Sequence, residues 1–370
     1  MRTVTVGVIG LGNIGAQHLN MLSGGRVAGA VLTAVCDTAD RVASLKDLPS
    51  DCKRFTDAAE LIKSGACDAV VIATPHSSHP GLAVSAFRSG LHVFCEKPAG
   101  VTTKEARRMN EEAARSGKIF TMNFNRRTDP VYRRIAGMIA SGEIGAVSRV
   151  EWTQTNWFRT DAYFRSAPWR GTWKGEGGGV LLNQAPHVLD LWQWFFGLPS
   201  RVRAFCRFGK NHRIEVEDEV TAFLEYRNAA TGTFITATGE APGTNRLEIV
   251  ADRGRLVMDD RKVSFDRVDG SVSEFLRNSE DGFAEPVSKR EEIPVSGEAD
   301  LLTGILGNFI SVIREGGDLL VPGAEGIRSL ELANAMVLSA WLDDWVSLPI
   351  DEDRYERELK SRFDSRSAAT

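Results

Sequence analysis

The sequence lacks the features that would carry a protein to a nucleic acid or into a membrane. Its 45 lysines and arginines are outnumbered by 49 aspartates and glutamates, for a formal charge of −4, and the basic residues form no block. Without a basic face there is no electrostatic reason to expect a polyanion as partner. No apolar run approaches the ~18 residues that indicate a membrane span. We therefore expect neither nucleic acid nor a membrane as partner, and we find no internal repeat or low-complexity tract.

Cysteine is also scarce. Cys36, Cys52, Cys67, Cys95 and Cys206 are odd in number, scattered, and without a C-x-x-C pair. This pattern is not that of a disulfide framework, so we expect reduced thiols, and we assign no metal ligand. The opening residues, MRTVTVGVIG, enter a strand pattern without the basic region and cleavage site of a signal peptide. These features favour a cytoplasmic protein.

The composition is that of an ordinary globular protein, with 42% hydrophobic and 25% charged residues. Because 370 residues exceed the size at which one core usually stops growing, we expect more than one domain. Strand and helix patterns alternate up to residue 124, which predicts an α/β Rossmann domain with a doubly wound parallel sheet. Residues 125–350 are predicted to form an α+β domain with a large, mostly antiparallel open-faced sheet. Residues 351–370 read as a charged tail in solvent.

A glycine-rich turn follows the first predicted strand. Val4 to Ile9 is apolar and β-branched, a helix pattern begins at Asn13, and a second strand ends at Cys36. Glycines in this context let backbone N–H groups approach a pyrophosphate at a helix N-terminus. The residues predicted to contact the dinucleotide here are Gly10, Gly12, Asn13, Ile14 and Gly15.

Asp37 follows the second strand and is predicted to select the cofactor. Its carboxylate can accept hydrogen bonds from the ribose hydroxyls of NAD and would repel the 2′-phosphate of NADP. NAD is therefore favoured over NADP. Arg41 could turn inward and neutralise such a phosphate, or it could lie in solvent on a helix face.

The segment LHVFCEKPAG carries the predicted chemistry, because an apolar strand stops at Glu96 and Lys97. Ligands of open α/β sheets lie outside the carboxyl ends of the strands, so these two side chains face a ligand. Thr74 to His79 follows another strand and faces the same crevice. For His79 two interpretations remain, contact with the nicotinamide ribose or a structural role beside the helix start at Pro80.

Beyond residue 141 the strands follow one another, and the stretch VLLNQAPHVLDLWQWFFG is predicted to form one helix between the first two. On one helix Asn183 and His187 would be i and i+4 on the same face, with Asp190 beyond them. A histidine there is usually a satisfied core residue, but the preceding glycines and polar neighbours favour a site. Arginines and aromatic side chains, including Tyr163, lie between residues 152 and 173 and suit a sugar ring; the alternative is that about half of these aromatic residues are core.

The combination of GLGNIG, ATPHSSH, HVFCEKP, NRR, SGEIG and GGG...N...H..D resembles the Gfo/Idh/MocA family of oxidoreductases from about residue 3 to 350. The resemblance implies a Rossmann domain, an open-faced sheet that mediates homodimers or homotetramers, and pyridine-nucleotide chemistry on sugars or cyclitols. It implies that Lys97, Asn183 and His187 form the catalytic group. Further cofactor contacts are assigned to Thr74, His76, His79, Glu96, Lys97, Asn125, Trp169, Arg170 and Arg41, and substrate contacts to Lys97, Arg126, Tyr163, Trp169, Arg170, Asn183 and His187.

The sequence departs from the family at Asn183, where aspartate is more usual. An amide can orient a hydroxyl but cannot take its proton at neutral pH, which leaves His187 as acid/base with Lys97 assisting. We therefore predict an NAD-dependent dehydrogenase that interconverts a ring secondary alcohol of a sugar, glycoside or cyclitol with its ketone by hydride transfer. The alternatives are an enzyme that keeps NAD bound and uses transient oxidation for isomerisation, transfer or glycoside cleavage, and an inactive nucleotide-sensing regulator.

Overall fold

A computed structural model describes residues 2–46, 48–301 and 303–363 and divides the chain into two compact units. Among the described residues, the first unit contains those of Met1–Thr128, Gly175–Gly177 and Asp300–Leu330, and the second contains the others. The segment Asp300–Leu330 thus belongs to the first unit, although the sequence analysis assigned it to the second domain. Within the described residues, no helix has the length and apolar character to cross a bilayer.

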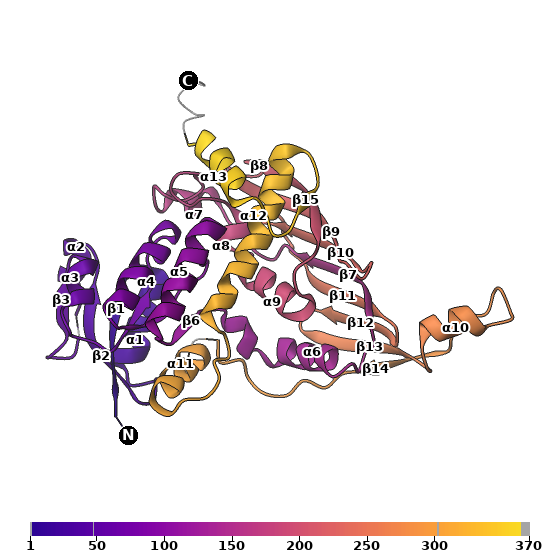
Figure 1. Ribbon diagram of the computed structural model, residues 1–370, viewed down its shortest axis with the longest axis horizontal. Helices are drawn as coiled ribbons and strands as arrows, with labels where there is room; N and C mark the ends of the chain where they lie inside the picture. The colour runs from indigo at the N-terminus through magenta and orange to yellow at the C-terminus, as the bar shows by residue number, and fades with distance from the viewer. Residues whose placement is uncertain (1, 47, 302, 364–370) are drawn as a thin grey trace. The chain divides into compact units, whose positions relative to one another are not determined.

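The first unit is built on a parallel sheet in the order β3-β2-β1-β4-β5-β6 among the described residues (Figure 1). This is the order of the dinucleotide-binding doubly wound fold, and the predicted fold class is confirmed. Its strands are β1 Val4–Ile9, β2 Ala30–Cys36, β3 Lys53–Phe55, β4 Ala69–Ile72, β5 His92–Cys95 and β6 Phe120–Met122. Its helices are α1 Asn13–Ser23, α2 Ala39–Ala43, α3 Ala58–Lys63, η1 His76–Ser78, α4 His79–Arg88, α5 Thr103–Ser116, η2 Asn125–Thr128, α11 Gly304–Glu315 and η3 Gly323–Glu325.

The central strands of this sheet are apolar along their whole length because both faces are covered. Each residue of β4 is buried, and Val6 and Val8 of β1 are fully inaccessible. A strand buried on both faces reads as a continuous apolar run instead of an alternating one. Phe309 of α11 packs edge-on against Phe94 of β5, with ring centroids 5.8 Å apart. This contact explains why the late segment belongs to the first unit.

The second unit contains a sheet in the order β14-β13-β12-β11-β7-β10-β9-β8-β15 among the described residues. Neighbouring strands are antiparallel except β7 and β10, which pair in parallel, so the predicted mostly antiparallel sheet is confirmed. Its strands are β7 Val147–Gln154, β8 Arg201–Phe208, β9 Glu217–Glu225, β10 Thr231–Ala237, β11 Asn245–Ala251, β12 Gly254–Asp259, β13 Lys262–Val268, β14 Ser288–Glu292 and β15 Val346–Ser347. Its helices are α6 Pro130–Ala140, α7 Asp161–Arg165, α8 Val180–Asn183, α9 Pro186–Phe196, α10 Val272–Asn278 and α13 Glu352–Ser361, and α12 Gly326–Leu342 runs from the first unit into the second.

Helix α9 covers one face of this sheet with a cluster of aromatic rings. Trp152 of β7 stacks on Phe195, with centroids 6.1 Å apart and planes at 4°, and Trp192 meets Phe234 of β10 edge-on. Buried and exposed residues alternate along β7 and β8, which leaves the opposite face of the sheet open.

The stretch from Val180 to Gly197 is not one helix. The prediction that Asn183 and His187 lie on the same face of one helix is therefore wrong. Helix α8 ends at Asn183 and α9 begins at Pro186. Proline has no backbone N–H to donate into a preceding turn and favours the first helical position. The chain therefore breaks at Pro186, and the two predicted catalytic residues lie on separate helices.

The C-terminal segment is also not a solvated tail throughout. Residues Glu352–Ser361 form helix α13, in which Tyr355 is 1% and Leu359 is 3% exposed. The Tyr355 ring stacks on Trp341 of α12 with centroids 5.5 Å apart. Tyr355 and Leu359 are i and i+4, a spacing that indicates a helix with one packed face. The many charged residues around them concealed this signal in the sequence. The remainder of the predicted tail, residues 364–370, lies outside the described residues.

Candidate active site

The glycine turn between β1 and α1 has the geometry of a pyrophosphate cradle. Gly10 has a φ of +89°, and a Cβ there would lie 2.7 Å from the Ala73 carbonyl. A Cβ on Gly15 would lie 1.9 Å from the Gly10 oxygen, so both glycines are needed for backbone packing. Gly12, the N-cap of α1, instead faces open space, with nothing within 4 Å of the Cβ position.

The N-terminus of α1 is open to an anion. It has no side-chain cap and no acidic residue in its first turn, which begins at Asn13 and Ile14. The first N–H groups of a helix have no partner within the helix and attract negative charge. The residues present therefore fit a dinucleotide pyrophosphate.

Asp37 lies beside this turn at the end of β2. Its carboxylate accepts hydrogen bonds from the backbone N–H of Leu11 at 2.5 Å and of Thr38 at 2.6 Å. The Arg41 guanidinium donates to the Leu11 carbonyl through Nε and Nη2, at 3.0 and 2.9 Å. Arg41 is exposed on α2 while its guanidinium is held against the glycine turn, and its contact with a nucleotide stays a prediction.

The segment after β4 supports the sheet edge through histidines. His79 is fully buried, and its Nδ1 and Nε2 lie 2.8 Å from the Pro98 carbonyl oxygen and 2.7 Å from the Thr74 carbonyl oxygen. Burial lowers the pKa of His79, although both carbonyls act in the opposite direction. Because both ring nitrogens already face protein oxygens, the structure favours a structural role over the predicted ribose contact. His76 is also buried, with Nδ1 3.4 Å from the Glu176 carbonyl oxygen.

Glu96 is a buried, anchored carboxylate at the end of β5. It is 4% exposed, and its Oε1 lies 2.7 Å from both His18 Nε2 and Asn123 Nδ2. Burial by itself would raise the pKa of Glu96, but the hydrogen bond from His18 and that from Asn123 outweigh it, so the pKa lies below its usual value. The carboxylate is therefore ionised near neutral pH and holds the chain where Lys97 begins.

Lys97 is half-buried and joined to Pro98 by a cis peptide bond. It lies at the carboxyl edge of the parallel sheet, as do the glycine turn, Thr74 and the segment after β6. In that last segment Asn125 and Arg126 are half-buried, whereas Arg127 is buried and paired with Glu325 at 2.7 Å. The first unit thus brings the predicted cofactor residues of its own strands to one edge.

In the second unit, Glu217 of β9 fixes the start of helix α8. This residue is fully buried, and its Oε1 accepts hydrogen bonds from the backbone N–H of Gly179 at 2.8 Å and of Leu181 at 3.1 Å. A Cβ on Gly179 would lie 1.9 Å from the Glu217 carbonyl oxygen, so only glycine fits this approach. The carboxylate therefore holds the helix that carries Asn183.

Asn183 and His187 are both half-buried on either side of the break between α8 and α9. Asp190, the third polar residue predicted on their face, is fully buried and accepts a hydrogen bond from Gln193 Nε2 at 3.0 Å. Asp190 thus has a hydrogen-bond partner within α9, as buried polar residues ordinarily do.

A second group in this unit surrounds Tyr163. The Arg170 guanidinium carbon lies 4.3 Å from the Tyr163 ring centroid and 4.5 Å from that of Trp169, so it is held between two aromatic faces. Arg170 donates to the Tyr163 hydroxyl, as does Gln184 Nε2 at 3.3 Å. Three predicted residues are therefore brought together, and Gln184 joins them without having been predicted.

The other aromatic residues divide between core and surface, in line with the alternative considered for them. Trp152 and Trp173 are buried, whereas Phe158 is 51% exposed. The ring centroids of Trp173 and Trp341 lie 5.2 Å apart. The sequence analysis also missed His18, Asn123 and Glu217. His18 follows Gly15 by three residues on α1, but nothing in its neighbourhood in the sequence pointed to Glu96.

Replacing Glu217 by alanine is expected to lower kcat by about tenfold or more and to destabilise the fold by about 1–3 kcal/mol, because two buried N–H groups lose their acceptor. The matched variant Glu217→Gln keeps an acceptor oxygen and should restore most of the activity. Steady-state kinetics and urea unfolding of both variants provide the measurement. Equal activity in wild type and Glu217→Ala would mean that this carboxylate does not position α8.

Comparisons with known proteins agree with this geometry. Residues 4–124 match the model described as an oxidoreductase family with an NAD-binding Rossmann fold, and residues 132–257 match the GFO/IDH/MocA C-terminal domain. The chain is 28% identical over 351 residues to inositol 2-dehydrogenase 2 of Paenarthrobacter aurescens. The match covers 92% of this chain and 97% of that protein. The chain is 26% identical over 263 residues to the myo-inositol 2-dehydrogenase of Thermotoga maritima, covering 69% and 75%.

Among solved structures, a levoglucosan dehydrogenase in complex with NADH and levoglucosan superposes with a TM-score of 0.77 at 21% identity, covering 94% of this chain and 100% of that one. At this identity the likeness concerns the fold. Since both halves match models of one family, the chain belongs to the Gfo/Idh/MocA family and is an NAD-dependent oxidoreductase acting on CH–OH groups.

Proposed function

We propose that this protein oxidises a ring secondary alcohol of a sugar, glycoside or cyclitol to the ketone, reversibly, with NAD as the oxidant. The observation that carries the proposal is the position of Lys97, directly after the buried and ionised Glu96 and at the same sheet edge as the glycine turn. A further support is that the relatives named above are inositol 2-dehydrogenases.

The first unit binds the cofactor in this proposal. Backbone N–H groups from Gly12 to Gly15 hold the pyrophosphate, and the Asp37 carboxylate accepts the adenosine ribose hydroxyls. Thr74, His76 and Asn125 flank the nicotinamide half. Bound NAD supplies the redox chemistry.

Lys97 and His187 divide the proton chemistry. The Lys97 ammonium donates a hydrogen bond to the substrate oxygen and polarises it, and the His187 imidazole takes the hydroxyl proton or returns it. Histidine side chains in general titrate near neutral pH, which suits this role. Asn183 orients the same hydroxyl through its amide but takes no proton.

The substrate ring is proposed to lie against the Tyr163, Trp169 and Arg170 group. Flat apolar faces suit the C–H side of a sugar ring, while the guanidinium and the Tyr163 hydroxyl serve its hydroxyl groups. Arg126 contributes from the first unit. Arg170 is held between two rings at 4.3 and 4.5 Å, so little side-chain entropy remains to be lost when substrate binds.

A panel of inositols, monosaccharides and glycosides, incubated with NAD and followed by the absorbance of reduced nicotinamide, tests this function. We expect net reduction with at least one cyclic polyol. Product formation without net reduction would support transient oxidation by tightly held NAD instead. NAD binding with no conversion of any substrate would support a nucleotide-sensing role.

Asp37→Ala is expected to relax the preference for NAD over NADP by about tenfold or more, because the carboxylate no longer repels the 2′-phosphate. The ratio of kcat/KM for the two nucleotides provides the measurement. Asp40→Ala, an exposed carboxylate on α2, is the matched control and should leave the ratio unchanged. An unchanged ratio in Asp37→Ala would mean that another residue selects the cofactor.

We also propose that the chain assembles as a homodimer or homotetramer through the open face of the nine-stranded sheet in the second unit. This face carries exposed residues on β7 and on β8, and dimers with isologous interfaces are the commonest homo-oligomers.

A further inference from the structure

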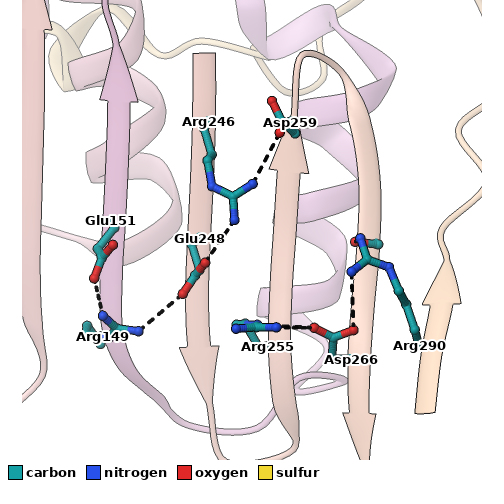
Figure 2. A network of polar contacts seen from close by, with 9 residues as sticks. Arg149, Glu151, Arg246, Glu248, Arg255, Asp259, Asp266 and Arg290 are labelled. Atoms are coloured by element: carbon teal, nitrogen blue, oxygen red, sulfur yellow. Dashed lines mark hydrogen bonds and ion pairs between the residues drawn. The ribbon is translucent and has the colours of Figure 1, made fainter. Parts of the chain in front are cut away.

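The Glu96 carboxylate differs from the surface charges of this protein in its burial. On the open face of the second unit's sheet, Arg149 pairs with Glu248 at 3.2 Å (Figure 2). On the same face Arg255 pairs with Asp266 at 2.8 Å. These two arginine side chains are 49% and 51% exposed, and exposed ion pairs contribute little to stability. Glu96 is only 4% exposed, so each hydrogen bond to its carboxylate matters far more.

Two side chains reach the Glu96 carboxylate from different parts of the first unit. His18 of α1 and Asn123, which follows β6, each place a nitrogen 2.7 Å from Oε1. Burial raises the pKa of Glu96, whereas His18, Asn123 and the neighbouring Lys97 ammonium lower it. Because an ionised carboxylate can only accept hydrogen bonds, Nε2 of His18 carries the hydrogen and donates it.

His18 differs from a histidine whose two nitrogens are both satisfied by the core. Its Nδ1 is buried and has no hydrogen-bond partner among the residues that the structure describes. His79, by comparison, has a carbonyl oxygen within 2.8 Å of each ring nitrogen. The His18 ring also packs edge-on against Phe94, with centroids 5.3 Å apart, a contact that an apolar side chain could equally make. A histidine at this position is therefore explained by its bond to Glu96.

Helix α1 connects this bond with the proposed cofactor site. The helix begins at Asn13, the end that fits a pyrophosphate, and His18 lies about 7.5 Å further along the axis. Glu96 directly precedes Lys97, and its backbone N–H donates to the Ile72 carbonyl of β4 at 2.9 Å. A helix, a buried hydrogen bond and a strand end are rigid elements. They link the pyrophosphate site to the lysine without a flexible segment.

We propose that His18 is a positioning residue, which holds Glu96 against α1 and thereby sets where Lys97 lies relative to the cofactor that α1 binds. His18 itself touches neither the cofactor nor the substrate. The inference rests on the proposed function, because Lys97 is the group that is positioned. It requires a donor of the correct reach at position 18, so polarity alone is not enough.

Two amide variants of His18 differ only in reach. The donor of His18→Gln is as many bonds from Cα as Nε2 of histidine, whereas the shorter side chain of His18→Asn cannot reach Glu96. His18→Leu, which favours a helix and keeps an apolar contact with Phe94, removes the donor a second way if His18→Asn does not fold. His92→Asn is the matched control, because His92 is a half-buried histidine of the same strand β5 whose Nδ1 accepts the Ile119 N–H at 2.9 Å.

Acetylation of Lys97 by acetic anhydride, followed by peptide mass spectrometry, tests the positioning without requiring turnover. Lys63, an exposed lysine of α3, is the internal standard. His18→Asn and His18→Leu are expected to raise the relative rate at Lys97 by about threefold or more, because a side chain that is no longer held opens to solvent more often. His18→Gln and His92→Asn should keep the wild-type rate. An unchanged rate in folded His18→Asn or His18→Leu would overturn the inference.

Steady-state kinetics on the best substrate of the panel provide the second measurement. His18→Asn is expected to lower kcat by about tenfold or more and to change KM for NAD by less than about threefold, because misplacing a reacting group is costly even when binding persists. His18→Gln should recover most of the kcat. A rise in KM for NAD with kcat unchanged would mean that His18 serves the cofactor site alone, and would overturn the inference.

A double variant distinguishes action through Lys97 from general damage to the fold. In the Lys97→Ala background, His18→Asn should change kcat by less than about twofold, since no lysine remains to be positioned. Effects that multiply in full would contradict action through Lys97. Acetylation that responds to His18→Asn without turnover of any polyol would instead overturn the proposed reaction and leave the positioning of Lys97 intact.

Discussion

Lys97→Ala is expected to lower kcat by at least ~100-fold, because a positioned acid/base or polarising group typically contributes that much to proton transfer. NAD binding should persist, since the contacts proposed for the glycine turn and Asp37 do not depend on Lys97. Steady-state kinetics on the substrate found in the panel, together with an NAD titration by fluorescence, provide the measurement.

The control for this prediction is Lys63→Ala, which removes an exposed lysine from α3 of the same unit. Its kcat should equal that of wild type. Lys97→Arg keeps the positive charge but changes its shape and reach, and it should recover only part of the activity. Unaltered turnover in Lys97→Ala would remove Lys97 from the reaction and leave Glu96 as an anchor without a catalytic consequence.

His187→Asn is expected to lower kcat by about 10²–10⁴-fold, since the amide that replaces the imidazole can form hydrogen bonds but cannot exchange a proton at neutral pH. The pH profile of kcat/KM should lose the limb that belongs to the general base. Kinetics from pH 5 to 9, a range of about four units around the usual histidine value, provide the measurement.

The double variant Lys97→Ala, His187→Asn tests whether the two residues act in the same reaction step or in two independent steps. Groups that act as a unit in one step are strongly non-additive, so the double variant should be little slower than the slower single variant. Effects that multiply in full would contradict action on the same alcohol. His212→Asn is a useful comparison, because His212 is a buried histidine bonded to the Thr238 hydroxyl at 3.0 Å and has no proposed part in the chemistry.

The dinucleotide-binding half could be predicted closely because its signals are local. Gly10, Gly12 and Gly15 lie within one turn, in which Gly15 packs against the Gly10 backbone, and Asp37 follows at the end of the next strand. Alternation of strands and helices along the chain predicts a parallel, doubly wound sheet. Such features depend on neighbours in sequence, and the sequence therefore reports them.

The features that could not be predicted depend on contacts between distant residues. His18 and Glu96 are 78 positions apart, and Gly179 and Glu217 are 38 apart, yet each pair shares a buried hydrogen bond. In the sequence a buried carboxylate looks the same as an exposed one. Only the fold shows which residues surround it. These partners can be read only after the strands are in place.

Two secondary-structure predictions were wrong. In each, a short local signal determined the structure, but a longer pattern of the opposite kind concealed it in the sequence. The apolar run from Val180 to Gly197 concealed the break at Pro186, where the missing N–H ends continuous helix bonding. In the C-terminal segment the charges concealed Tyr355 and Leu359, which pack on one side of α13. In both segments one or two residues determined the structure against the character of the residues around them.

The most direct test of the account is a crystal structure of the protein with NAD and the best substrate of the panel. The account predicts that the hydroxyl oxygen to be oxidised lies within about 2.6–3.2 Å of both Lys97 Nζ and a ring nitrogen of His187. A substrate bound beside the nicotinamide with either nitrogen directed into a different cavity would contradict it.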